Sequence, residues 1–354
     1  MRSVVTGGAG FLGSHLVELL LDEGDEVVVL DDESTGNRAN LRGVIDDPRL
    51  EYRVGSVLDP DVVRAAVRGS DRVFHLAAAV GVRRIVEHPL DGLRVNLHGT
   101  ENVLDACVAS GSRLLLVSTS EIYGKNTADA LHEGADRMLG SPLVARWTYA
   151  AAKGLDESFA HAYRQEYGLD VVIVRPFNTV GPRQTGRYGM VVPNLVGQAL
   201  RQEPLTVFGD GRQTRCFSSV FDVVPAFVQL IEEPRALGVA INLGGGTEIS
   251  ILELAERIVR LTGSDSAIRM VPYADAYGVG YEDMRRRVPD NSLARELIGF
   301  VPRTSVDDIV WSVATTLGDP TGAASPEWRA RRAAARAART AVPVTSVPEP
   351  ITSR

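Results

Sequence analysis

The first half of the chain alternates short apolar runs with longer stretches in which apolar residues recur at helical spacing. A short apolar run between polar residues or glycines is typical of a buried strand, and a longer amphipathic stretch is typical of a helix. The pattern predicts strands over residues 4–6, 27–30, 50–54, 72–76, 113–117 and 171–174, and helices over residues 11–23, 91–110 and 146–167, with another helix beginning near residue 60. This alternation predicts a parallel, doubly wound α/β sheet.

The pattern changes after Asn178, where Gly181-Pro182-Arg183 interrupts the alternation. Ser250 and Glu253 form a capping box, which predicts the start of another helix. Residues 190–201 have a helical pattern, residues 205–208 and 239–243 have strand patterns, and residues 273–290 have no clear period. We expect the strand over 239–243 to return to the main sheet.

The C-terminal residues have a different composition, rich in Ala, Arg, Pro and Thr. Such a segment lacks the apolar pattern that a core requires, although residues 326–340 are compatible with a basic helix. We therefore expect three parts: a main α/β domain (residues 1–177), a smaller lobe (178–317) and a poorly ordered tail (318–354).

A glycine pattern links the first predicted strand to the first predicted helix. Gly7, Gly10 and Gly13 have the spacing G-x-x-G-x-x-G. Glycines allow a tight turn, close approach of the backbone to a pyrophosphate, and close packing of the helix on the strand. The helix N-terminus adds partial positive charge for the phosphates. The second strand ends in Asp31, as expected for an acid that binds the adenosine ribose, so the segment predicts a dinucleotide site.

The acidic residues after the second strand favour NAD over NADP. Asp31, Asp32 and Glu33 are consecutive, and their charges would repel a 2′-phosphate. Arg38 is the nearby cation that would favour NADP instead.

Composition excludes several other classes of partner and site. The chain has 354 residues and a net charge of −7, which gives no reason to expect a nucleic acid. Its two cysteines, Cys107 and Cys216, have no metal-site spacing and are expected to be buried reduced thiols, so no metal is predicted. The sequence shows no membrane-length apolar run and no signal-peptide pattern, so we expect a cytoplasmic protein.

Tyr149 and Lys153 are the candidate catalytic pair. They lie four residues apart in a predicted helix and therefore share one face. The charge of Lys153 favours the tyrosinate, which would make Tyr149 a base nearer neutral pH. Thr119 follows the fifth strand, at the sheet edge where ligands bind in open α/β folds. We expect its hydroxyl to hydrogen-bond the same substrate oxygen, whereas His75 is expected to be a packed side chain.

These features together resemble the extended short-chain dehydrogenase/reductases that act on nucleotide sugars. The resemblance rests on residues 7–13, on the Tyr149 and Lys153 pair, and on Arg175-Pro176-Phe177-Asn178 followed by Gly181-Pro182-Arg183. It covers about residues 1–315 and implies a Rossmann-type fold, bound NAD and a smaller C-terminal substrate-binding lobe. It also implies that Tyr149 is the base, that Lys153 binds the nicotinamide ribose and that Thr119 orients the sugar.

The same resemblance implies the remaining ligand contacts and a homodimer formed through the helices that carry Asn96 and Tyr149. Residues 203–215 match the nucleotide-binding segment, whereas Ser56 stands where the family usually has an aspartate that contacts adenine. The implied cofactor contacts are Gly7, Gly10, Phe11, Leu12, Gly13, Asp31, Ser56, Val57, Leu76, Ala77, Ala78, Asn96, Tyr149, Lys153 and Pro176. The implied substrate contacts are Thr119, Arg146, Tyr149, Asn178, Val192, Arg215 and Arg287.

Within the family, Thr119-Ser120-Glu121 resembles the Thr-Ser-Glu of UDP-glucuronate decarboxylases. The 4,6-dehydratases have Thr-Asp-Glu, in which the aspartic acid protonates the departing 6-hydroxyl. Ser120 is poorly suited to that role, and an acid there would repel a 6-carboxylate. Arg146 matches an arginine of the decarboxylases, and residues 280–287 resemble the segment with their substrate-binding arginine, which we place at Arg287. The other interpretation is that these arginines bind only the diphosphate.

The prediction is therefore an NAD-dependent conversion of UDP-glucuronate to UDP-xylose. Tyr149 removes the proton of the 4-hydroxyl, hydride passes from C4 to NAD, and the β-keto acid loses carbon dioxide. Glu121 or Arg287 guides the proton to C5 before hydride returns to C4. The alternatives are a UDP-glucuronate or UDP-hexose 4-epimerase, a nucleotide-hexose 4,6-dehydratase, or a redox sensor without catalysis. The intact set of Thr119, Tyr149 and Lys153 argues against the sensor, which needs no base.

Overall fold

The computed structural model describes residues 1–79, 89–186, 189–277 and 282–318. Its main sheet has seven parallel strands in the order β11-β6-β5-β4-β1-β2-β3. The strand order reverses between β1 and β4, and ligands bind at such switch points in open α/β sheets. The strands are β1 (Arg2–Thr6), β2 (Glu26–Asp31), β3 (Leu50–Val54), β4 (Arg72–His75), β5 (Arg113–Val117), β6 (Val171–Pro176) and β11 (Ala240–Leu243).

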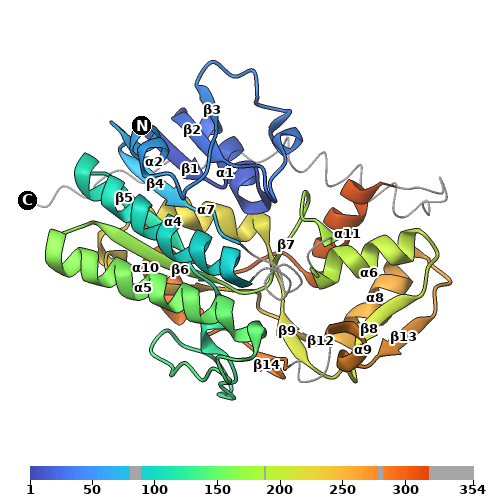
Figure 1. The fold of residues 1–354 in the computed structure, drawn as a ribbon. Helices are drawn as coiled ribbons and strands as arrows, with labels where there is room; N and C mark the ends of the chain where they lie inside the picture. The colour runs from blue at the N-terminus through green and yellow to red at the C-terminus, as the bar shows by residue number, and fades with distance from the viewer. Residues whose placement is uncertain (80–88, 187–188, 278–281, 319–354) are drawn as a thin grey trace, which may run out of the picture.

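Helices cover both faces of this sheet (Figure 1). Successive strand residues point to opposite faces, so Val4 packs with the helices of one face and Val5 with those of the other. One face carries α2 (Pro60–Val67), α4 (Pro89–Ser110) and α5 (Thr148–Tyr167), and the other carries α1 (Phe11–Asp22), α7 (Val220–Glu232) and α10 (Ser292–Ile298).

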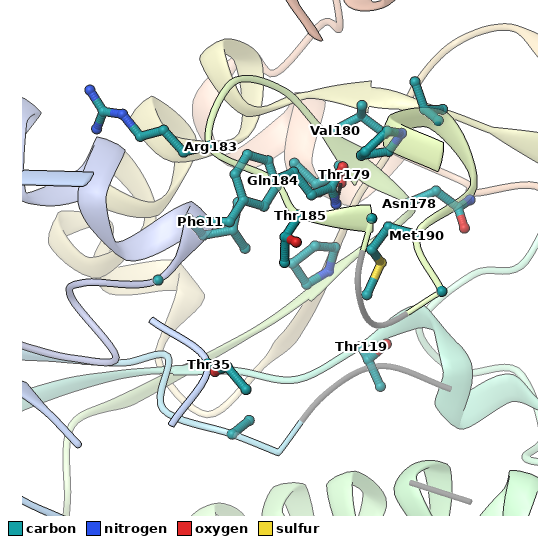
Figure 2. A pocket seen from close by; sticks show the side chains of 18 of the residues that line it. Phe11, Thr35, Thr119, Asn178, Thr179, Val180, Arg183, Gln184, Thr185 and Met190 are labelled. Carbon is teal, nitrogen blue, oxygen red and sulfur yellow. Dashed lines mark hydrogen bonds between the residues drawn. The ribbon is translucent and has the colours of Figure 1, made fainter. Parts of the chain in front are cut away.

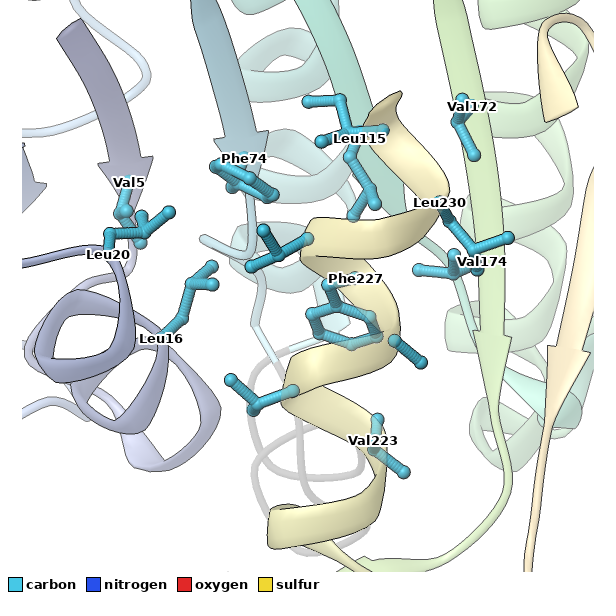
Figure 3. Packing of buried hydrophobic residues seen from close by; sticks show 14 of the residues in the cluster. Val5, Leu16, Leu20, Phe74, Leu115, Val172, Val174, Val223, Phe227 and Leu230 are labelled. Carbon is cyan, nitrogen blue, oxygen red and sulfur yellow. The ribbon is translucent and has the colours of Figure 1, made fainter. Parts of the chain in front are cut away.

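Helix α7 fills the centre of the second face, and Figure 3 shows it beside the strands and α1. Phe227 and Leu230 are fully buried in the cluster that contains Phe74 of β4 and Leu16 of α1. Burying one such side chain contributes about 2–3 kcal/mol. Helix α7 was not predicted from the sequence, because its apolar residues are nearly continuous and Pro225 lies inside it.

A second core cluster lies beyond the main sheet and contains smaller sheets with their own helices. One sheet pairs β8 (Leu205–Phe208) with β13 (Ile268–Val271), another orders β12 (Glu248–Ser250), β9 (Thr214–Cys216) and β14 (Arg286–Arg287), and a third pairs β7 (Thr179–Val180) with β10 (Ser218–Ser219). The helices are α6 (Val191–Leu200), α8 (Ile251–Thr262), α9 (Tyr273–Tyr277) and α11 (Val306–Leu317), and short 3₁₀ turns are η1 (Arg38–Leu41), η2 (Ser120–Tyr123), η3 (Ala145–Trp147) and η5 (Pro234–Ala236).

The structure confirms the predicted strands of the main sheet, including the return of β11 beside β6. The Ser250 side chain accepts a hydrogen bond from the Glu253 N–H at 3.1 Å, as the capping box predicts. The predicted start of the helix over 146–167 is wrong, because Arg146 lies in η3 and the α-helix begins at Thr148. Strand β14 forms where the sequence shows no period, and residues 319–354 lie outside the described residues.

Candidate active site

A cavity of about 910 Å³ opens at the carboxyl edge of the main sheet and continues toward the second core cluster. Ligand-binding pockets of enzymes have volumes of this order. Figure 2 shows Thr119, which follows β5, facing the same space as Asn178 and Met190 from the opposite wall. The predicted site residues that line it are Gly7, Gly10, Phe11, Leu12, Gly13, Asp31, Val57, Leu76, Ala77, Ala78, Thr119, Ser120, Glu121, Arg146, Tyr149, Pro176, Asn178, Val192, Arg215 and Arg287.

Three predicted contacts are not among the described lining residues: Ser56, Asn96 and Lys153. The Ser56 hydroxyl accepts a hydrogen bond from the Leu58 N–H at 3.2 Å, and Asn96 accepts one from the Ala79 N–H at 2.9 Å. Asn96 therefore shapes the cavity wall through Ala79. The role of all three in ligand binding stays a prediction.

The glycine-rich turn has the geometry that a dinucleotide requires. Gly7 has a φ of +70°, and an added Cβ there would lie 2.8 Å from the backbone nitrogen of Ala77. A Cβ on Gly13 would overlap the carbonyl oxygen of Gly7, so only glycine lets α1 approach β1 this closely. The first turn of α1, from Phe11 to Gly13, lines the cavity. This turn fits the pyrophosphate of NAD.

Asp31 lies at the end of β2 and is 6% exposed. Its carboxylate accepts hydrogen bonds from the N–H groups of Ala9, at 2.9 Å, and Glu33, at 2.8 Å. Burial raises the pKa of Asp31 despite these bonds. Each carboxylate oxygen can accept a further hydrogen bond, so Asp31 fits the ribose hydroxyls of the cofactor.

Arg38, the cation that would favour NADP, packs over the ring of Tyr52 with 5.1 Å between its guanidinium carbon and the ring centroid. The Tyr52 hydroxyl donates to Glu33 at 2.7 Å, which keeps an acid beside this arginine. The acids at positions 31–33 and the engaged arginine support the preference for NAD.

Tyr149 begins the cavity-facing part of α5 and hydrogen-bonds with Thr119. Its pKa is raised, first by burial and then by the charges of Glu121 and Asp156, against the opposing effects of Thr119 and Arg287. This differs from the expectation that Lys153 brings the tyrosine nearer neutral pH. Burial is the largest cause of the raised pKa, and the ammonium of Lys153 is paired with Asp156 at 2.8 Å.

Three arginines and two acids form a buried charged cluster next to Tyr149. Arg146 binds Glu121 through two nitrogens, at 2.5 and 3.1 Å, and Arg287 contacts the same acid at 3.3 Å. Arg215 binds Asp283 at 3.1 Å, and the Arg146 side chain lies 3.9 Å from Asp283. The three arginine side chains are at most 9% exposed, so this wall of the cavity carries one excess positive charge.

The cluster shifts the acidity of its members. Burial alone would raise the pKa of Glu121, but Arg146 and Arg287 outweigh it and hold the pKa at about 2. Burial, together with Arg215 and Arg146, lowers the pKa of Arg287 to about 10 although Glu121 opposes this. Arg287 also contacts the side-chain oxygen of Asn178. The predicted grouping of Glu121, Arg146 and Arg287 is therefore observed.

Other residues of the site were not predicted. Asp283 neutralises Arg215, and Asp156 pairs with Lys153. Glu282 accepts from the Trp147 indole N–H at 2.8 Å, which ties the segment before α5 to the segment that carries Arg287. The sequence contains a signal for the pairing of Asp156 with Lys153, because Asp156 lies three residues later and therefore on the same helix face. No local pattern indicates the partners of Asp283 and Glu282. His75 is fully buried, as expected for a packed side chain.

The family model for the NAD dependent epimerase/dehydratase family matches residues 3–244. The chain belongs to the NAD-dependent epimerase/dehydratase family. It is 39% identical to a UDP-N-acetyl-alpha-D-glucosaminuronate decarboxylase of Bacillus cytotoxicus, over 86% of this chain and 94% of the relative. It is 38% identical to UDP-glucuronic acid decarboxylase 1 of Arabidopsis thaliana, over 86% of this chain and 67% of the relative.

Solved structures of this family share the fold of the chain. A UDP-glucuronic acid 4-epimerase of Bacillus cereus, in complex with UDP-glucuronic acid and NAD, has a TM-score of 0.81 and 28% identity, covering 90% of this chain and 99% of that one. A dTDP-glucose 4,6-dehydratase of Streptomyces venezuelae with NAD has a TM-score of 0.80 and 32% identity, covering 90% and 96%. NAD is the cofactor of the family, and the turn and Asp31 described above fit it.

Two further findings concern the described residues only. None of their helices combines the length and apolarity needed to cross a bilayer. No group of three or more His, Cys, Asp or Glu side chains among them has a metal-binding arrangement.

Proposed function

We propose that the chain is an NAD-dependent decarboxylase that converts UDP-glucuronate to UDP-xylose. The observation that carries this proposal is the excess positive charge of the arginine cluster beside Tyr149. The three guanidinium groups share two carboxylates, and a carboxylate on the sugar would balance the remaining positive charge of the cluster. Ser120, buried between Thr119 and Glu121, adds no second negative charge.

The residues of the chain have distinct roles in this reaction. Tyr149 takes the proton of the 4-hydroxyl, and Thr119 holds the same oxygen. NAD, when bound, accepts the hydride from C4 and later returns it. Arg146 and Arg287 hold the carboxylate, which leaves as carbon dioxide once C4 is a ketone. Glu121, held ionised by the two arginines, keeps them oriented, and a proton then reaches C5.

A second candidate substrate is UDP-N-acetylglucosaminuronate. It is favoured by the 39% identity to the Bacillus decarboxylase named for that compound. Its carboxylate presents the same chemistry to the arginine cluster, so the charge argument applies equally. The main competing reaction is 4-epimerisation, in which the arginines would only hold the acid; the structural neighbour from Bacillus cereus is a UDP-glucuronic acid 4-epimerase.

The test is incubation of the purified protein and NAD with a panel of nucleotide sugars, read by product mass. We expect UDP-glucuronate to lose one carbon dioxide, and UDP-glucose and TDP-glucose to remain intact. An isobaric product from UDP-glucuronate would mean epimerisation, and loss of water from a neutral hexose would mean dehydration. Tyr149→Phe should abolish turnover but retain NAD binding, because the ring keeps its packing.

We also propose a homodimer, a cytoplasmic location and a smaller lobe after residue 177. Leu155 and Tyr167 on α5 are 50% and 62% exposed, which supports a homodimer through α4 and α5. A monomer by light scattering at micromolar concentration would contradict it. The buried free thiols Cys107 and Cys216 support a reducing, cytoplasmic location. One core cluster consists only of residues from Val180 onward, which supports a smaller lobe after residue 177 from which α7, β11 and α10 return to the main sheet.

A further inference from the structure

We propose that Asp156 is a positioning residue that holds the ammonium of Lys153 and sets the pH at which Tyr149 becomes a base. Tyr149, Lys153 and Asp156 lie at positions i, i+4 and i+7 of α5, on one helix face. The inference rests on the proposed function in one respect, the role of Tyr149 as base.

Lys153 and Asp156 form a buried ion pair. The Nζ atom of Lys153 lies 2.8 Å from Oδ2 of Asp156, and the side chains are 2% and 0% exposed. A buried ammonium requires a counterion, and Asp156 supplies one on the same helix. An ammonium has three N–H donors, so the contact with Asp156 leaves two for a ligand and for Tyr149. Asp156 thereby fixes where Lys153 points.

A chain of buried polar groups supports Asp156 from the neighbouring elements. The Thr100 side chain of α4 lies beside Asp156, and its hydroxyl is 3.2 Å from Nε2 of His75. The other ring nitrogen of His75 lies 2.7 Å from the Thr6 hydroxyl, which accepts from the Ala77 N–H at 3.2 Å. Burial and the charge of Lys153 lower the pKa of His75 to about 3, so its ring is neutral.

With His75 neutral, the donors of this chain can all run in one direction. The Ala77 N–H donates to Thr6, Thr6 donates to Nδ1 of His75, and Nε2–H donates to Thr100, which lies beside the carboxylate of Asp156. This order places the negative end at Asp156. The network therefore connects β1, at the glycine-rich turn, to the catalytic lysine.

The charge of Asp156 acts on Tyr149. The groups that face Tyr149 are Thr119 and Glu121 near β5, Arg287 of β14, and Asp156 on its own helix. Asp156 itself faces Lys153 and Glu157 of α5 and Thr100 of α4. Two helical turns separate Tyr149 from Asp156, about 10 Å, so at an effective dielectric constant of about 20 one charge shifts a pKa by about one unit.

The test compares Asp156→Asn with Glu166→Gln, which removes one charge from an exposed position on the same helix. Each variant, and the parent, is also made in a second form that carries Tyr149→Phe. The two forms of each NAD-loaded protein differ only in Tyr149, so the difference in their ultraviolet absorbance as pH rises follows the Tyr149 phenolate alone. We expect Asp156→Asn to lower the half-ionisation pH of Tyr149 by about one unit, and Glu166→Gln to leave it unchanged. The same titration in Asp156→Asn as in the parent would overturn the inference.

Asp156→Ser is a second neutral variant with the same expected shift, should Asp156→Asn not fold, and Asp156→Glu keeps the charge and should keep the parental titration. The acid limb of the kcat profile, measured with whichever nucleotide sugar is consumed, should move to lower pH by the same amount. A purely structural role would lower kcat at every pH without moving that limb. The phenolate titration tests the role of Asp156 without any turnover. The product mass tests the proposed decarboxylation with the unmodified protein, so either proposal can fail without the other.

Discussion

At the scale of single residues, the site holds one acidic group ionised and a neighbouring one protonated. Glu121 is held ionised by two arginines, whereas Tyr149 is held protonated by burial and by two nearby acids. The arrangement therefore keeps a fixed anion for orienting Arg146 and Arg287, and a neutral phenol beside it.

Arg287→Ala should lower kcat/KM for UDP-glucuronate by one to several orders of magnitude, because a charge-assisted contact to the carboxylate is lost. Arg286→Ala is the matched control, since the neighbouring Arg286 pairs with Glu248 at the surface. Steady-state kinetics of both variants check the prediction. Equal effects of the two substitutions would show that the loss of kcat/KM comes from a disturbance of β14 and not from the missing guanidinium of Arg287.

Glu121→Gln should reduce stability by roughly 3 kcal/mol at neutral pH, since the pKa of Glu121 falls from 4.5 to about 2 on folding. For a lowered carboxyl pKa, this stabilisation is complete above the unfolded value and disappears as pH falls toward about 2. Urea unfolding of both proteins between neutral pH and pH values below 4.5 measures the difference. A difference that stays constant over this range would contradict the origin we assign to it.

At the scale of elements, the β1–α1 turn and α5 supply most of the chemistry. The turn depends on close backbone contact, and α5 presents Tyr149, Lys153 and Asp156 on one face. Each feature arises within a short piece of chain, which is why local sequence indicated both elements.

Gly13→Ala should cost about 1–3 kcal/mol and greatly weaken NAD binding, because the added Cβ would overlap the backbone of Gly7 and Gly8. Gly197→Ala in α6 is the control, since its Cβ would meet the flexible end of Arg201 at 3.1 Å and the end of Leu317 at an ordinary contact distance of 3.9 Å. We expect that control to gain up to about 1 kcal/mol of helix stability. Thermal melting and NAD titration check both variants; normal NAD affinity in Gly13→Ala would exclude the close-approach argument.

At the scale of the whole molecule, one cavity joins the carboxyl edge of the main sheet to the second core cluster. The glycine-rich turn and Asp31 lie at one end, and Arg215, Asp283 and Arg287 at the other. The two halves of the chain therefore contribute different parts of a single site, with Tyr149 between them.

Deletion of residues 319–354 should leave activity and melting temperature close to those of the parent. The segment has no apolar face large enough to add much to a core, whereas α11, just before it, already buries Ile309, Val310 and Val313. Product formation and a thermal melt of the truncated protein are the measurements. A large fall in either would show that the basic segment docks on the folded part.

The sequence by itself determined where the strands of the main sheet lie along the chain. It also determined the glycine-rich turn, the acid at position 31 and the spacing of Tyr149 and Lys153. These features depend on periods of two or 3.6 residues and on backbone freedom, which act over a few neighbouring positions. It also indicated Arg287 through a resemblance, but not the neighbours of that arginine.

Only the tertiary structure decided which charges meet. Arg287 reaches Glu121 from 166 positions away, Asp283 faces Arg215, and α7 enters the main core without a clear sequence pattern. The acidity of Tyr149 was likewise decided there, since burial, Glu121 and Asp156 raise its pKa. Charge interactions and desolvation depend on distance in space and on exclusion of water, and neither quantity is encoded in the spacing of residues along the chain.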